Sequence, residues 1–472
     1  MVNEATATTD TDHFADSTPM KSGPASRQPP QVEFPLLHCI DWSFNDADTD
    51  EHVHGPHNYP AQMPPQIPRT LFQYFQLTGD LTRGDWVYDP FSGSGTTAVE
   101  ARLAGLNSLS HDVNPFACEL TQANAIPLDP SLLTVFRDRL LTGLQTELQN
   151  VRERHHADAE IAVQKPAVRE GWFPYPQLYE LCKIRDRITV LKAETPDAPV
   201  CDGIIRLFRV ALAYTTRRVS YQRNGEFKRH RIADADRDDH DPDVFDIFTD
   251  QLSETIDALR TYTAIAPHTC TTTVLQTDSR KAEHLDPNSI DIVLTSPPYG
   301  DHATTVAYGQ YSQDPAIVAW GRDYEEMRQV DKDGLGGKNE ILEPLPTLEQ
   351  WSPTLAETLD SLRKKDGRAD DALDFFTDFY AVLEDVARVV KPGQPVVWVV
   401  GNRTMSRVPI PTHLITLELC NHLGFTHETT LARDIPDKTL PWENAPENLP
   451  GVTNELMASE YILLMRAPEA TA

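Results

Sequence analysis

Two short segments of the sequence combine residue types that could bind a cofactor and a substrate. The first, DPFSGSGTT at residues 89–97, lies between an apolar strand pattern and a helical pattern. Gly93 and Gly95 allow a ligand to approach the backbone closely, and the N–H groups that begin the next helix can bind its polar part. A tight strand-to-helix turn would explain the glycines alone, but it would not require the flanking Asp89 and the paired threonines. This segment lacks the GxxxxGK pattern, so a triphosphate-binding P-loop is disfavoured.

A carboxylate follows at the end of the next strand pattern. Asp112 stands 17 residues after Gly95. At the carboxyl end of a parallel strand, such a carboxylate can accept hydrogen bonds from the ribose hydroxyls of a nucleotide. The same spacing suits a nicotinamide dinucleotide, so the position alone leaves the cofactor open.

The second segment is TSPPYG at residues 295–300, directly after the apolar run IDIVL. Two consecutive prolines fix an extended backbone without N–H donors, so their carbonyl groups and the Ser296 hydroxyl form a row of acceptors. Tyr299 adds a flat aromatic face. Acceptors beside an aromatic ring suit a planar ring with an exocyclic NH2 group, such as a nucleobase taken out of its stack. The alternative is a diproline loop that only ends a strand.

Strand and helix patterns alternate around both segments, and their order predicts the fold. Strand patterns cover residues 85–91, 106–115, 271–279, 289–299, 395–401 and 460–466, and helical patterns cover 96–104 and 374–390. The second helix has a broad apolar face and should end at the Lys-Pro-Gly sequence of residues 391–393. Such alternation predicts an α/β fold with a doubly wound, mostly parallel sheet covered by helices on both faces.

Three other stretches differ in composition from this core. Residues 1–30 have almost no large apolar side chains, and we expect a disordered tail. Residues 127–267 carry helical periodicity and predict an inserted helical domain, a candidate for target recognition. Residues 300–372 are polar and predict a mobile loop or lid. The catalytic domain would then comprise residues 31–126 and 268–472.

The overall composition limits the class of protein. The formal net charge is −29, and the acidic excess is spread along the whole chain. An Asp-rich, Lys-poor surface resembles proteins of high-salt cytoplasms, although an ordinary acidic protein is the alternative. The six cysteines form no CxxC pair, which argues against a disulfide framework and a zinc cluster. The sequence has no stretch of about 18 apolar residues, and the acidic start is unlike a secretion signal, so we expect a cytoplasmic protein.

The two motifs together resemble a known family. DPFSGSGTT upstream of TSPPY is similar to the S-adenosylmethionine-dependent DNA amino-methyltransferases, which modify cytosine N4 or adenine N6 by base flipping. Further matches lie at residues 57–68, 112–125 and 277–280, and looser ones at 401–402 and 431–436. The resemblance covers roughly residues 34–125 and 270–466, outside the helical insert and the lid. It implies a seven-stranded, Rossmann-like methyltransferase sheet.

The resemblance also implies roles for individual residues. Phe91 would pack near the sulfonium of S-adenosyl-L-methionine, Asp112 would take the ribose hydroxyls, and Asp278 the adenine amino group. Ser296 and the Pro297 carbonyl would accept hydrogen bonds from the target amino group while Tyr299 stacks on the flipped base. The implied cofactor-binding residues are Asp89, Pro90, Phe91, Ser92, Gly93, Ser94, Gly95, Thr96, Asp112, Asp278 and Tyr59, and the implied catalytic residues are Ser296, Pro297, Pro298 and Tyr299. The methyl group would move directly, in line.

The target base and the class of substrate have alternatives. Family members with SPPY are more often cytosine-N4 enzymes and those with DPPY adenine-N6 enzymes, so we expect cytosine N4 in double-stranded DNA. No Pro-Cys pair is present for carbon-5 methylation. The alternatives are adenine N6, an RNA guanine-N2 methyltransferase, and a catalytically silent cofactor-binding scaffold of a defence system. A restriction endonuclease or another defence protein is a possible partner, and no metal is expected.

One part of the insert is locally basic. Residues 215–231 have a local charge of +5 within the acidic chain, with Tyr221 and Phe227 interleaved. Such a strip could contact DNA phosphates, or it could pair with the acidic run at 234–243. The WFPY sequence at 172–175 is expected to anchor the insert rather than to stack on bases. The candidate DNA-binding residues are Arg217, Arg218, Arg223, Lys228, Arg229 and Arg231.

Overall fold

The computed structural model describes residues 35–161, 163, 165–195, 199–223, 228–300, 306–338, 342–365, 368–435, 443–444, 454–455 and 459–469. The chain divides into two units, residues 1–39 and 40–472. The first contains the short helix α1 (Pro35–His38). The tail expected at residues 1–30 lies outside the described residues, as does Phe227.

The second unit is built on a seven-stranded sheet. Its order is β3-β2-β1-β4-β5-β11-β8, with parallel pairing from β3 to β5 and antiparallel pairing of β11 with both β5 and β8. The strands are β1 (Trp86–Asp89), β2 (Asn107–Asp112), β3 (Thr272–Gln276), β4 (Ile292–Thr295), β5 (Pro395–Gly401), β8 (Thr426–Asp434) and β11 (Ser459–Arg466). The expected mostly parallel, seven-stranded sheet is confirmed.

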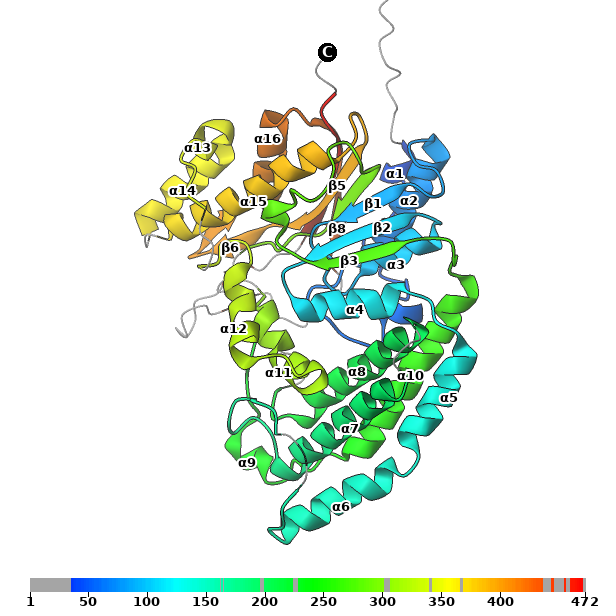
Figure 1. Ribbon diagram of the computed structural model, residues 1–472. Helices are drawn as coiled ribbons and strands as arrows, with labels where there is room; N and C mark the ends of the chain where they lie inside the picture. The colour runs from blue at the N-terminus through cyan, green and yellow to red at the C-terminus, as the bar shows by residue number, and fades with distance from the viewer. Residues whose placement is uncertain are drawn as a thin grey trace, which may run out of the picture. The chain divides into compact units, whose positions relative to one another are not determined.

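Helices cover both faces of the sheet, as the fully buried strand patterns require. All seven residues of β5 are buried. On one face Trp398 of β5 packs edge-on against Phe379 of α15 (Ala369–Val389), together with α16 (Thr412–His422). The other face carries α2 (Gln66–Thr78), α3 (Thr96–Leu103) and α4 (Pro115–Ala125). Figure 1 shows α15 and α4 on opposite sides of the strands.

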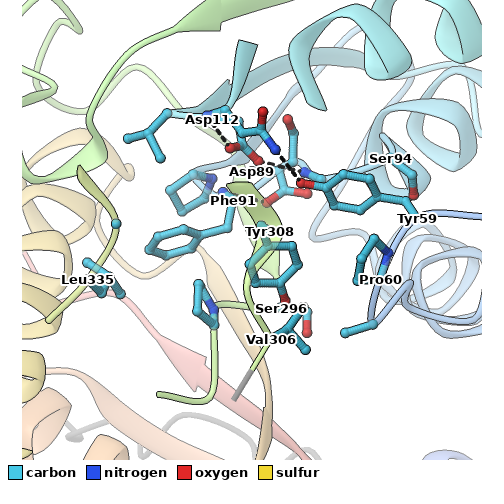
Figure 2. A pocket seen from close by; sticks show the side chains of 18 of the residues that line it. Tyr59, Pro60, Asp89, Phe91, Ser94, Asp112, Ser296, Val306, Tyr308 and Leu335 are labelled. Carbon is cyan, nitrogen blue, oxygen red and sulfur yellow. Dashed lines mark hydrogen bonds between the residues drawn. The ribbon is translucent and has the colours of Figure 1, made fainter. Parts of the chain in front are cut away.

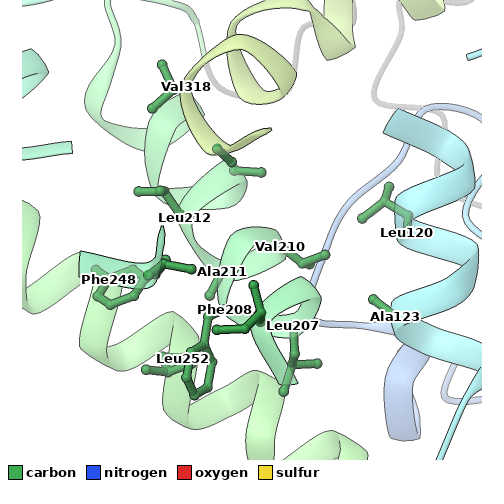
Figure 3. Packing of buried hydrophobic residues seen from close by; sticks show 14 of the residues in the cluster. Leu120, Ala123, Leu207, Phe208, Val210, Ala211, Leu212, Phe248, Leu252 and Val318 are labelled. Atoms are coloured by element: carbon green, nitrogen blue, oxygen red, sulfur yellow. The ribbon is translucent and has the colours of Figure 1, made fainter. Parts of the chain in front are cut away.

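In the described parts of the stretch between α4 and β3, six helices are present. They are α5 (Pro130–Leu141), α6 (Leu144–His156), α7 (Tyr175–Ala193), α8 (Pro199–Val219), α9 (Asp234–Arg237) and α10 (Val244–Ile265). They do not form a separate compact unit, because α11 (Tyr308–Trp320) and α12 (Tyr324–Asp333) from beyond β4 share their apolar core. Figure 3 shows side chains of α4, α8, α10 and α11 gathered in this core, with Leu120, Phe208, Phe248 and Val318 among them.

The stretch expected to be a loop or lid is largely helical where it is described. It contains α11 (Tyr308–Trp320), α12 (Tyr324–Asp333), α13 (Leu348–Trp351) and α14 (Pro353–Lys365). Leu355, Leu359 and Leu362 of α14 are all buried, a helical spacing that the high polarity of the segment hid. The loop expectation was therefore wrong for these residues.

The remaining elements are short. They are the 3₁₀ turns η1 (His52–His54) and η2 (Ser279–Lys281), the antiparallel pair β6 (Arg403–Met405) and β7 (Val408–Ile410), and the pair β9 (Glu443–Asn444) and β10 (Asn454–Glu455). Within the part of the chain that the structure describes, no helix is long and apolar enough to cross a membrane.

Candidate active site

A pocket lies at the carboxyl ends of β1, β2 and β4, where the strand order reverses between β1 and β4. In open α/β sheets this reversal leaves a crevice for ligands. The pocket is lined by residues of the loop after β1, by residues 59–63, by the ends of β2 and β3, by the segment after β4 and by the end of α12. Figure 2 shows Phe91, Tyr308 and Ser296 around the same space. The two motifs of the sequence therefore meet in one pocket.

Asp89 ties the first motif to the second. Its buried carboxylate accepts hydrogen bonds from the Phe91 backbone N–H at 3.0 Å and from the Thr295 hydroxyl at 2.6 Å. Thr295 ends β4 and precedes the acceptor segment, so this contact fixes the two motifs relative to each other. Burial raises the pKa of Asp89. Phe91 lies partly exposed on the pocket wall.

The backbone conformation of the first motif requires glycine at residues 93 and 95. Gly93 and Gly95 have φ values of +52° and +89°, which side chains rarely adopt. A Cβ at Gly95 would stand 2.8 Å from the Cα of Thr121 in α4. The loop therefore packs tightly against α4 at this residue.

We expect Gly95→Ala to destabilise the fold by about 2–4 kcal/mol, from left-handed strain and overpacking together. Gly79→Ala is the matched control, because Gly79 has a similar φ of +87° and nothing within 4 Å of its added Cβ. Urea unfolding of both variants measures the difference. Equal losses of stability would contradict a packing role for Gly95.

Asp112 lies at the end of β2 with its carboxylate at the pocket. It accepts the Gly93 N–H at 3.0 Å and the Asn114 N–H at 2.8 Å. Burial raises the pKa of Asp112 to about 6, although the two backbone hydrogen bonds act in the opposite direction. Each carboxylate oxygen accepts one of these two bonds, so acceptor sites remain for ligand hydroxyls.

Two residues not in the first motif complete this end of the pocket. Tyr59 stacks on Tyr308 of α11 with ring centroids 5.7 Å apart. Asn114 donates to the Tyr59 hydroxyl at 3.0 Å and to the Ser312 hydroxyl at 2.8 Å, and its side-chain oxygen caps α4. Tyr59 was expected in the site from the family resemblance, whereas Asn114 was not. The Asn-Pro pair at the start of a helix was a capping signal that could have found it.

Asp278 reaches the pocket, but Arg280 already binds its carboxylate. The Arg280 side chain contacts both Asp278 oxygens, at 3.0 Å and 2.7 Å, and also donates to Asp378 of α15 at 2.7 Å. The Arg280 backbone N–H adds a further bond to Asp278 at 2.9 Å. An adenine amino group would have to share this crowded carboxylate. Arg280 was not predicted as the partner of Asp278, because their pairing depends on the η2 turn.

The acceptor segment is divided between the pocket and the protein interior. Ser296, Pro298 and Gly300 line the pocket, whereas Pro297 is buried. The Tyr299 hydroxyl lies 3.3 Å from the Ser296 hydroxyl and donates to Glu460 of β11 at 3.0 Å. Tyr299 is not among the described lining residues. Burial and the charge of Glu460 hold the pKa of Tyr299 well above its usual range.

The basic strip of the insert splits into packed and exposed side chains. Arg217 lies over the Tyr311 ring at 3.7 Å, and Arg229 binds Asp314 at 2.6 Å and lies over Trp172. Arg218, Arg223 and Arg231 are exposed, and Lys228 is half-buried. The alternative of pairing with residues 234–243 fails for Arg229, because its acidic partner is on α11. Trp172 is buried, as expected of an anchor.

Comparison with known proteins identifies the family. The model of a DNA methylase family matches residues 10–123. The type II methyltransferase M.MvaI of Kocuria varians is 30% identical over 440 residues, which cover 90% of this chain and 93% of that protein. The chain belongs to the DNA amino-methyltransferase family. Type II methyltransferases of this family use S-adenosylmethionine.

Further relatives of this DNA methyltransferase match over shorter stretches. M.MjaII of Methanocaldococcus jannaschii is 36% identical over 88 residues, 18% of this chain and 16% of that protein. M.BsoBI of Geobacillus stearothermophilus is 27% identical over 95 residues, 18% of each chain. The solved structure of a candidate DNA modification methylase from Thermus thermophilus is 26% identical, with a TM-score of 0.17, and covers 22% of this chain and 40% of that one. Among the methyltransferase residues that are described, no group of three or more His, Cys, Asp or Glu is placed to hold a metal ion.

Proposed function

We propose that this methyltransferase modifies a specific DNA sequence by moving the methyl group of S-adenosylmethionine to the exocyclic amino group of a flipped base, cytosine N4. The observation that carries the proposal is that Ser296 and Pro298 face the same pocket as the Asp89–Gly95 loop and Asp112. A glycine-containing loop after β1 and part of the segment after β4 line one cavity, which supports the proposal. Serine rather than aspartate before the two prolines supports cytosine N4 over adenine N6.

The pocket residues fit the proposed cofactor. Asp112 has acceptor sites left for ribose hydroxyls, and it is partly exposed to the pocket. Phe91, Tyr59 and Tyr308 offer aromatic surface, which attracts a cation such as a sulfonium. When bound, the cofactor supplies an electrophilic methyl group. The proposed methyl transfer needs no metal to position or polarise the amino group.

The proposed chemistry needs alignment and acceptors rather than a covalent enzyme intermediate. Ser296 and the Pro297 carbonyl would hold the amino group and draw its hydrogens away from the nitrogen lone pair. The nitrogen would form a bond to the methyl carbon as the carbon–sulfur bond breaks and leaves its electron pair on sulfur, and the methylated nitrogen would release one proton to water. Such positioning within a closed site can supply much of the rate enhancement.

We expect the affinity for S-adenosylmethionine to fall as the pH drops below about 6. Hydroxyl donors bind the ionised form of Asp112, whose pKa is raised to about 6, so protonation removes an acceptor. Above that pH the affinity should be constant. Calorimetric titrations between pH 5 and 8 measure the effect.

Asp112→Asn is the control for that titration, because its side chain does not ionise. A second carboxyl, Asp378, also has its pKa raised to about 6, by burial. If Asp112→Asn kept the same pH dependence, the effect would belong to another group and the proposed role of Asp112 in the titration would be wrong.

The exposed arginines of the insert are the proposed DNA phosphate contacts. We expect Arg218→Glu with Arg223→Glu to weaken DNA binding about tenfold or more at low salt and to lower the salt slope by about two. Arg137→Glu with Arg139→Glu on α5 is the matched control, with the same change of charge at another part of the insert. Fluorescence anisotropy with a labelled duplex measures both. Equal weakening by the two pairs would show only a general charge effect.

The base and the site specificity can be tested in cells. We expect a bacterial host without DNA methyltransferases to acquire N4-methylcytosine at one short recognition sequence when it expresses this protein, as read by single-molecule sequencing. N6-methyladenine at one sequence would correct the base, and modification without sequence preference would contradict site specificity. We also propose a restriction endonuclease of the same specificity as its partner.

A further inference from the structure

We infer that Glu460, which lies outside every motif, is a positioning residue that fixes the direction of the hydrogen bond reaching Ser296. By doing so it makes the Ser296 oxygen a pure acceptor toward the pocket, suited to an amino group. This inference rests on the proposed function, because it assigns how the methyl acceptor is selected at the same site.

The residues involved come from the neighbouring strands β11 and β8 and from the segment that follows β4, on the other side of β5. In the strand register, Glu460 of β11 lies opposite Arg433 of β8 on one side and Gly401 of β5 on the other. Arg433 donates to one Glu460 oxygen at 2.8 Å, and their side chains are only 4% and 15% exposed. Tyr299 donates to the other Glu460 oxygen at 3.0 Å.

The charge of Glu460 sets the direction of these bonds. A carboxylate paired with a guanidinium has no proton, so it can only accept. The Tyr299 hydroxyl has one proton, and it points at Glu460. Toward Ser296, 3.3 Å away, the Tyr299 oxygen can therefore only accept. The raised pKa of Tyr299 keeps its proton in place.

The consequence for Ser296 follows from counting its protons. A serine hydroxyl has one proton and two lone pairs. If the proton is donated to Tyr299, only lone pairs remain for the pocket. A base that presents an NH2 group can donate a hydrogen bond to this oxygen. A base that presents a carbonyl oxygen there cannot, because the carbonyl oxygen and the Ser296 oxygen are both acceptors and no proton lies between them. The chain of bonds therefore favours cytosine or adenine over thymine or uracil.

Reversing the direction of these hydrogen bonds should turn Ser296 into a donor toward the pocket. Without the Glu460 charge, the Tyr299 proton is free to turn to Ser296, and the Ser296 proton then turns into the pocket. We expect Glu460→Gln, which keeps the shape of the side chain, to slow methyl transfer to DNA by about 10- to 100-fold while S-adenosylmethionine binding stays unchanged.

The matched control is Glu428→Gln. Glu428 of β8 binds Arg466 of β11 at 2.7 Å, and its side chain is 16% exposed, so the substitution breaks a similar ion pair between the same two strands. Because the partners of Tyr299 and Ser296 in the described part of the chain do not include this pair, the rate should remain that of the wild type.

The test is a double-mutant cycle with Tyr299→Phe, measured as the single-turnover rate of methyl transfer from labelled S-adenosylmethionine to unmethylated DNA. If Glu460 acts through the tyrosine hydroxyl, Glu460→Gln has no further effect in the Tyr299→Phe background. The inference would be overturned if Glu460→Gln slowed methyl transfer by the same factor in the wild-type and Tyr299→Phe proteins. It would also be overturned if Glu460→Gln alone had the wild-type rate. A wild-type protein that transfers no methyl group to DNA would instead refute the proposed function, independently of any variant.

The substitution leaves Arg433 buried without its counter-charge, so thermal unfolding is measured beside the rate. If Glu460→Gln does not fold, Arg433→Leu with Glu460→Leu removes both charges and tests the same point. We expect the folded double variant to be slow at a wild-type affinity for S-adenosylmethionine. A fast folded double variant would overturn the inference.

Discussion

Replacing Ser296 with alanine is expected to slow methyl transfer about 10²–10³-fold, the usual cost of losing one preorganised hydrogen-bonding group in an active site. Ser296 is the hydroxyl that faces the pocket at the end of β4. In the proposed mechanism, its loss would leave the target amino group with fewer acceptors and a less defined position. Rapid-quench single-turnover measurements at saturating S-adenosylmethionine report this step.

The binding of S-adenosylmethionine should be unchanged in Ser296→Ala, because the bonds that hold Asp112 and the loop after β1 come from other residues. Ser289→Ala is the matched control. Ser289 lies before the amino end of β4, and its hydroxyl donates to the Asp286 carbonyl at 2.7 Å. A Ser296→Ala enzyme as fast as this control would remove the acceptor segment from the mechanism.

Replacing Asp112 with alanine is expected to weaken S-adenosylmethionine binding by about 100-fold or more. Hydrogen bonds to a charged group contribute about 1.5–3 kcal/mol each, and Asp112 would make them to ribose hydroxyls. The substitution also releases the Gly93 and Asn114 N–H groups, which hold the loop after β1 against the start of α4. Isothermal calorimetry measures the affinity.

The matched control for Asp112→Ala is Asp85→Ala, at the opposite end of the same sheet. Asp85 accepts the Thr82 N–H at 2.7 Å just before β1. We expect the affinity of the Asp85→Ala variant for S-adenosylmethionine to equal that of the wild type. If Asp112→Ala also bound S-adenosylmethionine normally, the proposed placement of the cofactor would be wrong.

The parts of the site that lie at the carboxyl ends of strands could be predicted from the sequence. The segment 89–97, Asp112 and the segment 295–300 each follow an apolar strand directly. Because the carboxyl ends of parallel strands meet at one edge of a sheet, their convergence followed from the predicted fold. Tyr59 was placed through the family resemblance, and it does line the pocket.

The partners of these residues could not be predicted, because they come from distant parts of the chain. Glu460 reaches Tyr299 across 161 residues, and Arg280 reaches Asp378 across 98. Neither contact has a local sequence signal. Both depend on which strands and helices become neighbours, which the order of the patterns does not determine.

Some elements of the fold also could not be predicted from the sequence. β8 was not predicted as a strand, because two of its inward-facing residues, Thr429 and Arg433, are polar and so weaken the apolar alternation. Helices α12–α14 were hidden by their polar composition, and α11 by the internal Pro315, a residue type that disfavours helix interiors. The assignment of the insert to target recognition and the high-salt origin suggested by the acidic surface stay predictions.

The proposed activity is tested most directly by incubating the purified protein in molar potassium chloride with labelled S-adenosylmethionine and either unmethylated DNA or transfer RNA. Mass spectrometry of the digested nucleic acid then identifies the methylated nucleoside. We predict N4-methylcytosine in DNA and no label in RNA. N6-methyladenine would keep the mechanism and correct the base, whereas label only in RNA, or in neither nucleic acid, would contradict the account.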